Sequence, residues 1–338
     1  MSTSIPGPDL ADQVAGSKSM RFTVETWDPS YGGSVEQELA PTAVPVTVDV
    51  EQPADRWAPV APEAVTEPSA VLFVDGVRRI EARAWIDADT AGGEAGLSLC
   101  ASYAAGVVCC CEGRSHLVAH AVRRSLVTFV PSAIVIITSA GVFTALHVAP
   151  DPATPPLVRL SSMLQRRMAE LELITAVNAR TSGVQHDAGG NDLLVVDGPL
   201  RGGTTPDRTL GFVKTHRMTY LPADLNAVVG MLASGQRTPV FLMGQQFPKY
   251  TWYLRLPCPP GHAWAGIVRV EADPHLPAAD AIGFANLSQS VLPRFASVEY
   301  KDSRAPQNLY PIAGLERDLR RRLGDSRVLY RALRAAAG

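Results

Sequence analysis

The chain has few cysteines, and they lack the spacing of a zinc site. Its 338 residues include five of them: Cys100, Cys109, Cys110, Cys111 and Cys258. Zinc ligands usually occur in pairs such as Cys-x-x-Cys, with a second pair further along the chain. No such pairs occur here, and the three consecutive cysteines lie in an apolar, strand-like stretch. We therefore predict buried, free thiols in a reducing cytoplasm and no zinc site.

The sequence also lacks a hydrophobic leader and a good membrane helix. It begins with the polar segment MSTSIPGPDLADQ, which is unlike a secretory signal peptide. The uncharged run Ser125–Leu146 is long enough to span a bilayer, but it is rich in Val, Ile and Thr and is interrupted by Pro131 and Gly141. Two buried strands explain this composition better. We expect a cytoplasmic protein that does not enter a membrane.

Charged residues are sparse and unevenly distributed. They make up 19% of the chain, and the net charge is −2. Residues 1–70 hold eleven acidic residues against three basic ones, a balance of −8, so the remainder carries +6. A basic body is compatible with a polyanionic partner, and ordinary surface charge accounts for it equally well.

Composition divides the chain at residue 70. Residues 1–69 are acidic and Pro-rich, with alternating stretches at Met20–Trp27 and Val44–Val50 that predict one or two edge strands. Residues 70–338 show no linker, and 46% of the whole chain is hydrophobic. We expect residues 70–338 to fold as one α/β domain that carries an N-terminal extension.

Two apolar segments end in the same dipeptide, Asp-Gly. They are VLFVDG at 71–76 and LLVVDGP at 193–199. A short run of this kind predicts a buried strand, and glycine permits a sharp turn after it. Asp75 and Asp197 are then expected at the carboxyl ends of their strands, where open α/β sheets bind ligands. Adjacent carboxylates repel each other unless a cation lies between them. The alternative is that both are ordinary turns.

The other predicted elements indicate a fold class. Apolar stretches at 80–87 and 96–111 predict hairpin-connected strands, and helical spacing of apolar residues predicts a helix at Leu157–Arg180. Further strands and a C-terminal helix over 314–337 follow. This order resembles the RNase H-like architecture, a mixed sheet flanked by helices. That architecture places acids from two strands and a helix around divalent metals, which neutralise phosphodiester charge and activate water.

The sequence resembles the NurA nuclease family over roughly residues 70–335. The resemblance rests on FVDG at 73–76, LLVVDGPL at 193–200, LGFVKTH at 210–216 and LYP at 309–311. It implies a DNA nuclease that uses Mn²⁺ or Mg²⁺, forms a homodimer and works with the hexameric HerA ATPase in DNA end processing. It also implies that Asp75 and Asp197 are metal ligands, together with a helix glutamate between them in sequence.

Two residues are candidates for the helix glutamate. Glu170 and Glu172 both lie in the predicted helix Leu157–Arg180. Because they are two residues apart, their side chains point about 200° away from each other, so only one can face a metal. The family spacing slightly favours Glu172, and either one could instead be a solvated helix glutamate. Glu81 is a further candidate because it follows Asp75 by six residues in the expected hairpin.

A lysine and a histidine end the next predicted strand. Lys214 closes the apolar run LGFVK and matches a lysine of the family, which implies contact with the scissile phosphate or the nucleophile. His216, two residues further on, would share the same face of the strand. The alternatives are that the lysine is a surface residue and that the histidine is structural.

The C-terminal part departs from the family pattern. Tyr310 begins a Tyr-Pro pair that, in the family, is followed about two turns later by a metal-binding histidine. No histidine occurs after His275 in this chain. Glu316 or Asp318 could substitute for it, or Asp302 could complete the metal shell.

Other polar residues near this helix are candidates for DNA contact. Gln307 and Asn308 could bond a nucleotide or cap the helix. Seven arginines of the terminal helix could bind phosphates or form a solvated face. They are Arg317, Arg320, Arg321, Arg322, Arg327, Arg331 and Arg334.

These features together predict a metal-dependent DNA nuclease that works with a separate motor. The chain has no GxxxxGK[ST] phosphate-binding loop, so it cannot translocate DNA by itself. One alternative is a catalytically inactive adaptor that binds DNA or the ATPase, and the other is a hydrolase of a small molecule. Carboxylates too far apart to share a metal would favour the adaptor. A closed pocket would favour the small-molecule enzyme.

Overall fold

The computed structural model describes most of the chain from residue 40 onward. The described residues are 40–41, 44–86, 96–181, 190–201, 205–216, 218–245 and 247–337. The strand expected at Met20–Trp27 lies outside these ranges. The described part of the expected extension contributes β2 to one edge of the main sheet, paired with β11. The domain boundary at residue 70 stays a prediction.

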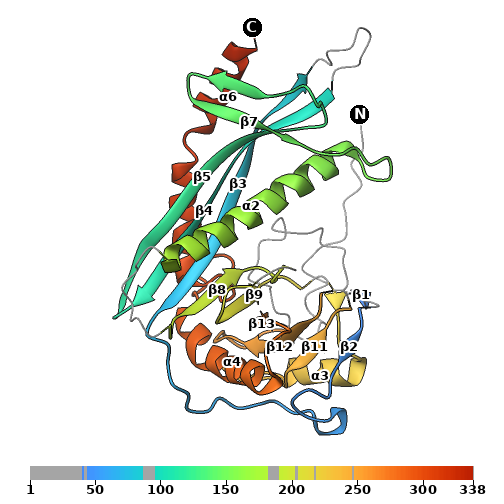
Figure 1. Cartoon of the computed structure of the whole chain (residues 1–338). Helices are drawn as coiled ribbons and strands as arrows, with labels where there is room; N and C mark the ends of the chain where they lie inside the picture. The colour runs from blue at the N-terminus through green and yellow to red at the C-terminus, as the bar shows by residue number, and fades with distance from the viewer. Residues whose placement is uncertain are drawn as a thin grey trace, which may run out of the picture.

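The described strands form one large mixed sheet and a small pair (Figure 1). The large sheet has the order β2-β11-β12-β13-β9-β8-β3-β4-β5-β7-β6, and β1 pairs with β10. The strands are β1 (Ala40–Pro41), β2 (Val46–Thr47), β3 (Val71–Ile86), β4 (Gly96–Cys111), β5 (Arg114–Thr128), β6 (Val135–Thr138), β7 (Gly141–His147), β8 (Leu193–Asp197), β9 (Thr209–Val213), β10 (Met218–Thr219), β11 (Phe241–Met243), β12 (Lys249–Arg255) and β13 (Ile267–Ala272).

The centre of this sheet has the predicted RNase H-like arrangement. β3, β4 and β5 form an antiparallel meander, and β8 and β9 then continue the sheet parallel to β3. The helical segments are η1 (Ala54–Arg56), α2 (Pro156–Thr181), α3 (Ala223–Met231), α4 (Ala278–Val291), η2 (Leu292–Phe295), α5 (Tyr310–Arg322) and α6 (Ser326–Ala336). The prediction of a mixed sheet flanked by helices is therefore confirmed.

The first Asp-Gly motif does not end its strand. β3 runs from Val71 to Ile86 and pairs with β4 along this length, with one irregularity near Glu81. The separate strand predicted at 80–87 is therefore wrong, and Asp75 and Glu81 lie on one strand instead of two arms of a hairpin. The second motif behaves as predicted, because β8 ends at Asp197 and Gly198 has a φ of 115°.

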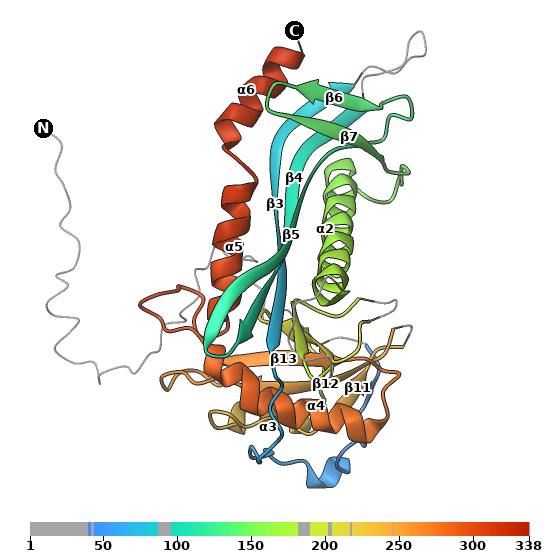
Figure 2. The same cartoon turned by 60° about the vertical axis from the view of Figure 1, so that its left-hand side comes forward.

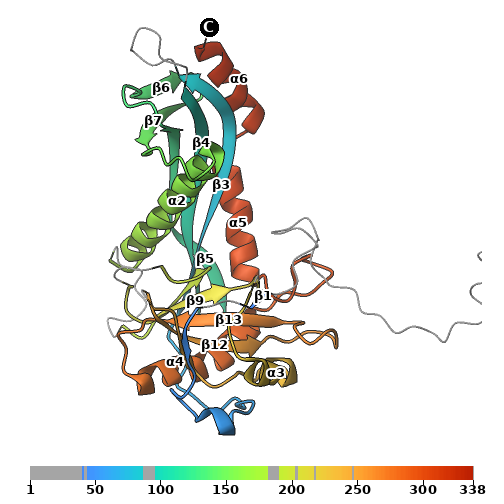
Figure 3. The same cartoon turned by 90° about the vertical axis from the view of Figure 1, so that its right-hand side faces the viewer.

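Helices cover both faces of the long strands. Figures 2 and 3 show these strands between α2 on one side and α5 with α6 on the other. α4 packs against β12 and β13 at the other end of the molecule. The helix predicted at Leu157–Arg180 is confirmed as α2, whereas the single helix predicted over 314–337 is two helices. The break occurs because Gly324 has a φ of 85° and Asp325 caps α6 by accepting bonds from two backbone N–H groups.

The prediction of two buried strands in the uncharged run Ser125–Leu146 is wrong. The run contains the end of β5 together with β6 and most of β7, not two buried strands. Residues of β6 alternate between exposed and half-buried, as in an edge strand with one face in solvent. In the part of the chain that the structure describes, no helix combines the length and apolar character needed to cross a membrane.

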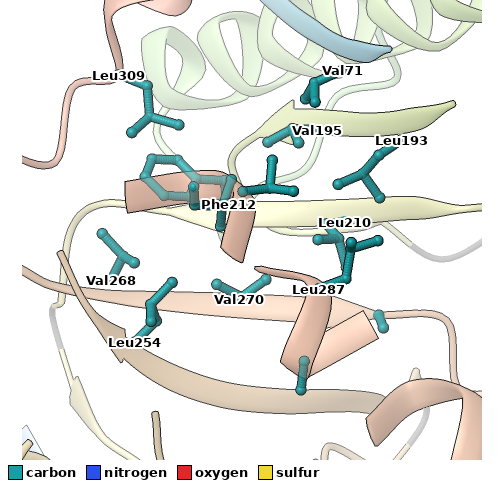
Figure 4. Packing of buried hydrophobic residues seen from close by; sticks show 14 of the residues in the cluster. Val71, Leu193, Val195, Leu210, Phe212, Leu254, Val268, Val270, Leu287 and Leu309 are labelled. Carbon is teal, nitrogen blue, oxygen red and sulfur yellow. The ribbon is translucent and has the colours of Figure 1, made fainter. Parts of the chain in front are cut away.

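Alternate residues of three adjacent strands belong to a core that they share with β12, β13 and α4 (Figure 4). The buried side chains are Val71 and Phe73 of β3, Leu193 and Val195 of β8, and Leu210 and Phe212 of β9. Leu309 and Ile312, at the start of α5, belong to the same cluster. Since side chains alternate between the two faces of a sheet, the next residues on this face are Asp75, Asp197 and Lys214. On each of the three neighbouring strands, the apolar residues of this face are thus followed by a polar residue, and these three polar residues lie close together.

Candidate metal centre

Asp75 and Asp197 lie side by side on parallel strands. The last paired residues of β3 and β8 are Val74 and Val196, so the next residue on each strand is an aspartate. Both carboxylates follow apolar stripes that face α5, and Asp75 is 6% exposed. Asp75 sits in the middle of a long strand and Asp197 at the end of a short one. The site therefore lies where β8 stops and β3 continues.

A third carboxylate reaches this point from α5. Glu316 shares the buried face of α5 with Ile312, Leu315 and Leu319. One oxygen each of Asp75, Asp197 and Glu316 lies within 4.8 Å of the other two. Three carboxylate oxygens at this separation form a donor set that suits a hard divalent cation such as Mg²⁺ or Mn²⁺.

Two oxygens in this group have no hydrogen-bond partner among the described residues. They are Oδ2 of Asp75 and Oδ1 of Asp197, and both are buried. The other Asp75 oxygen, Oδ1, accepts a 2.7 Å bond from the backbone N–H of Gly76. A buried carboxylate oxygen without a partner is costly, and a bound cation removes that cost. The residues present therefore fit a metal ion.

The electrostatics of the site agree with this fit. Burial raises the pKa of Asp75 well above its usual value, and the charge of Asp197 raises it further. Burial also raises the pKa of Asp197, against the opposing effect of Lys214. In the protein alone, the ionised form of each aspartate is therefore disfavoured. A bound cation would stabilise the ionised carboxylates.

Glu172 approaches the site from the opposite face of the sheet. It lies on α2 with only 8% of its surface exposed. A Cβ atom on Gly76 would collide with Glu172 Oε1 and crowd Met168, so the glycine of the first motif permits close approach of a helix and does not make a turn. Burial raises the pKa of Glu172 to about 8, and the charge of Asp197 contributes. Glu172 lies next to the group of Asp75, Asp197 and Glu316 but is not a member of it.

Lys214 is fixed between a carboxylate and an amide. Its Nζ donates to Asp197 Oδ2 at 2.6 Å and to Asn308 Oδ1 at 3.0 Å. Burial lowers the pKa of Lys214, but the Asp197 and Asp75 carboxylates outweigh this effect, and the net shift is upward. Asn308 Nδ2 in turn donates to Asp302 Oδ2 at 2.6 Å. Asp302 therefore acts on the site through Asn308.

Arg304 holds the α5 carboxylate in place. Its two terminal nitrogens donate to the two oxygens of Glu316 at 3.0 and 2.6 Å, a bidentate geometry that fixes the carboxylate plane. Arg304 Nε also lies 3.6 Å from Asp302 Oδ1. No sequence pattern singles out Arg304, because it lies in the irregular segment that precedes α5.

The other predicted residues lie elsewhere. Glu170 is on the outer face of α2, where it pairs with Arg166 and Arg167. Glu81 is buried on β3 and accepts 3.0 Å bonds from Arg79 Nε. Glu170 and Glu81 therefore pair with nearby arginines and do not belong to the three-carboxylate group.

Three further candidates also have their own surroundings. Asp318 pairs with Arg322 one turn further along α5, at 2.6 Å. Tyr310, at the start of α5, is 38% exposed and lies beneath Lys301. The ring of His216 packs against aromatic rings, and its Nε2 donates to the Ile267 carbonyl at 2.9 Å. Burial lowers the pKa of His216 to about 4.

A cavity of about 550 Å³ opens onto the carboxylates. Its lining includes Asp75, Asp197 and Glu316 together with Arg78, Arg79 and Arg320. Arg78 and Arg320 are exposed, as are the other six arginines of the two C-terminal helices. The exposed side of the cavity therefore carries Arg78 and Arg320, and its buried side carries the carboxylates. This arrangement suits a phosphate-bearing polymer that passes over bound cations.

A comparison with protein families agrees with the sequence resemblance. The family model described as the NurA domain matches residues 146–320, slightly more than half of the chain. This range begins after Asp75 and includes Glu172, Asp197, Lys214 and Glu316. No curated protein matches the chain. Among solved structures, the chain is similar to the NurA nuclease from Sulfolobus solfataricus, with 10% identity over 79% of this chain and 84% of that one and a TM-score of 0.43.

Proposed function

The chain belongs to the NurA family, and we propose that it is a DNA nuclease that requires Mn²⁺ or Mg²⁺. The observation that carries this proposal is the convergence of Asp75, Asp197 and Glu316 within 4.8 Å of one another. The unpartnered buried oxygens of the two aspartates support it. Asp75, which lies outside the family match, comes from a strand directly beside β8.

The residues have distinct parts in this proposal. Asp75, Asp197 and Glu316 would hold the metal, and Glu172 would serve a second ion or a water on the other side of β3. The metal, when bound, supplies an activated water and neutralises charge on the phosphate. Lys214 opposes the upward pKa shift that burial gives Asp197 and places a fixed positive charge beside it. Arg304 holds Glu316 in one orientation.

The arginines at the cavity mouth would bind the DNA backbone. Arg78 and Arg320 line the cavity that contains the carboxylates and are exposed, and guanidinium groups bind phosphate oxygens in pairs of hydrogen bonds. Such contacts fix the position of a strand without reading its sequence. The exposed arginines beside the carboxylates therefore support a substrate that extends beyond a single nucleotide.

The rival interpretation as an inactive adaptor depends on the distance between the carboxylates. It required Asp75 and Asp197 to lie too far apart to share a metal, or no glutamate to join them. Glu316 joins them at metal-binding separation, and this favours the nuclease. The exposed arginines at the mouth of the cavity favour a polymer over a small-molecule substrate.

The proposal includes two protein partners, both taken from the family resemblance: a second copy of the chain and a HerA-type hexameric ATPase. Exposed apolar side chains at the end of the sheet that holds β6 and β7 support contact with another protein. They are Trp85, Ile134, Val135, Ile137 and Val142. Because the chain has no motor loop of its own, a separate ATPase would move the DNA. Measuring the molar mass of the chain alone and with such an ATPase tests both partners.

A cleavage assay tests the proposed activity. End-labelled DNA is incubated with the wild type, Asp75→Ala and Asp197→Ala in Mn²⁺, and with the wild type after chelation. We expect cleavage by the wild type with Mn²⁺ and loss of cleavage in both variants and after chelation. Asp318→Asn, which changes an outward carboxylate on the same helix as Glu316, is the matched control and should cleave normally. Equal activity of all proteins would remove Asp75 and Asp197 from the mechanism.

A further inference from the structure

The tip of the β4–β5 hairpin gathers two cysteines and a histidine. One ligand atom each of Cys109, Cys111 and His116 lies within 4.8 Å of the other two. Cys109 is buried, Cys111 is half-buried and His116 is exposed. The group therefore extends from the core to the surface at one place. None of the five cysteines forms a disulfide in the described structure.

A tight turn sets the positions of these three residues. β4 ends at Cys111 and β5 begins at Arg114, and the two residues between them, Glu112 and Gly113, have φ angles of 48° and 71°. Two consecutive positive φ angles define the two-residue hairpin turn that fixes strand register. The sequence Glu-Gly supplies a glycine for one of these positions, where other residues are strained. The turn therefore leaves little freedom for the register of the strands that follow it.

That register brings the three side chains to one face. Cys109 pairs directly with His116, and Cys111 pairs with Arg114. Residues directly opposite each other on antiparallel strands have Cβ atoms about 5 Å apart, and diagonal neighbours on the same face remain within side-chain reach. Cys109 and Cys111 share a face because they are two residues apart. Cys110 points to the other face, where it packs against the buried cluster that contains Leu315 and Leu319 of α5.

We propose that Cys109, Cys111 and His116 form a binding site for Zn²⁺, separate from the carboxylate centre. Two thiolates and one imidazole are the ligands that Zn²⁺ prefers, and three protein ligands leave a fourth position for water on the exposed side. Zinc–ligand bonds of about 2.0–2.3 Å require ligand atoms roughly 3.5–3.8 Å apart. Small rotations of Cys111 and His116, the less buried members, would close the remaining gap.

The spacing along the chain did not predict this site because its third ligand comes from across a turn. Cys-x-Cys followed five residues later by His is not a familiar zinc motif. The pairing of β4 with β5 brings His116 directly opposite Cys109. The earlier expectation of free thiols without a metal is therefore replaced by this proposal.

The site is chemically distinct from the carboxylate centre. Asp75 pairs with Gly106 on β4, so Cys109 lies three residues, or about 10 Å, further along that strand. The two groups share no ligand. Sulfur ligands select softer cations, whereas three carboxylates favour Mg²⁺ or Mn²⁺. One chain could therefore hold two kinds of metal at once.

A bound Zn²⁺ would cross-link the end of the hairpin. Cys109 packs with Ala176 and Ala179 of α2 in one buried cluster, so a metal at this point ties β5 to the part of β4 that supports α2. Burial raises the pKa of the Cys109 thiol, and its hydrogen bond with Cys111 adds to this. Both thiols must lose their protons when Zn²⁺ binds.

Cobalt substitution tests the site in the full-length protein. Co²⁺ bound by cysteine thiolates gives an intense sulfur-to-cobalt absorption in the near ultraviolet, to which the carboxylate centre cannot contribute. We expect one such Co²⁺ per chain, displaced by Zn²⁺. Cys111→Ala and His116→Ala should each weaken binding at least about tenfold. His116 is exposed, so its replacement leaves the core intact.

Cys110→Ala is the matched control, because Cys110 lies on the same strand but faces the other way. It should bind Co²⁺ as the wild type does. Absence of the sulfur-to-cobalt absorption in the wild type, or an unchanged affinity in Cys111→Ala or His116→Ala, would overturn the proposal. Cleavage of DNA in Mn²⁺ is measured on the same variants. Its failure would count against the nuclease and not against this zinc site.

Discussion

Gly76 of β3 lies directly against Glu172 of α2, so closely that a Cβ on Gly76 would collide with the glutamate carboxylate. The glycine therefore gives an acidic side chain access to the strand that carries Asp75. We predict that Gly76→Ala displaces Glu172 and destabilises the fold by about 1–3 kcal/mol. Cleavage should fall as well. Chemical denaturation and the cleavage assay measure the two effects.

Gly283→Ala is the control for this prediction. Gly283 lies in α4, and apart from its chain neighbours and the backbone of its own helix no described atom lies within 4 Å of a Cβ placed on it. Alanine in a helix interior is favoured over glycine by about 0.5–1 kcal/mol, so this variant should be slightly more stable and fully active. Wild-type stability and activity in Gly76→Ala would contradict the close packing of Glu172.

Removal of the Lys214 ammonium should be costly. Lys214 and Asp197 form a largely buried pair with Nζ and Oδ2 2.6 Å apart. Breaking such a pair leaves an uncompensated charge and costs about 3–5 kcal/mol. We predict that Lys214→Met loses about this much stability without metal and recovers part of it in Mn²⁺, which replaces the lost positive charge. Thermal denaturation with and without Mn²⁺ measures both. A loss of stability that Mn²⁺ does not reduce would argue against a cation at Asp197.

The stability of the metal-free protein should decrease as pH rises. The pKa of Glu172 is about 8 in the folded protein, against 4.5 for an ordinary glutamate. Between these values the folded state binds a proton that the unfolded state has lost, so the free energy of unfolding falls with increasing pH. Glu172→Gln removes this proton uptake, and its denaturation curves should depend less on pH. An unchanged pH dependence in this variant would contradict the burial of Glu172 as an acid.

Stabilisation by Mn²⁺ should show the opposite trend. The carboxylates bind a cation in their ionised form, and burial raises the pKa of both Asp75 and Asp197. Protons therefore compete with the metal. We predict that the rise in melting temperature caused by Mn²⁺ grows with pH. A rise that is constant with pH would indicate that Mn²⁺ binds elsewhere.

Glu316 should replace the histidine that the family pattern places on this helix. We predict that Glu316→Gln lowers cleavage at least about tenfold and weakens Mn²⁺ binding. Arg304→Lys keeps the charge but loses the bidentate geometry, and it should show a smaller loss of the same kind. Asp318→Asn, two residues from Glu316, provides the comparison. Full activity of Glu316→Gln in Mn²⁺ would show that the carboxylate of Glu316 is dispensable.

The sequence predicted the two aspartates and the lysine because they end apolar runs. Side chains of each run alternate between the two faces of the sheet. A polar residue that follows the apolar residues on one face is therefore a clearer sign of a functional site than the dipeptide Asp-Gly alone. The glycine was misinterpreted because its two roles, making a turn and allowing close approach, cannot be distinguished without the position of α2. For the same reason, a turn was expected between Asp75 and Glu81, whereas both residues lie on β3.

Helical periodicity predicts which glutamates lie on the buried faces of α2 and α5. Glu172 follows Leu164 and Met168 at intervals of four on the buried face of α2, whereas Glu170 lies off that face. Glu316 likewise follows Ile312 by four residues on α5. A charged residue within an apolar helical stripe is therefore the useful signal. The contacts of Arg304 and Asn308 lie in the segment before α5, where no periodicity exists to predict them.

Mn²⁺ binding to the carboxylate group tests the central claim most directly. Equilibrium dialysis or electron paramagnetic resonance of Mn²⁺ is applied to the wild type, Asp75→Asn, Asp197→Asn and Asp318→Asn. We predict that the first two variants bind at least about tenfold more weakly than the wild type, while Asp318→Asn binds normally. Wild-type affinity in both Asp75→Asn and Asp197→Asn would contradict the assignment of this site as a metal centre.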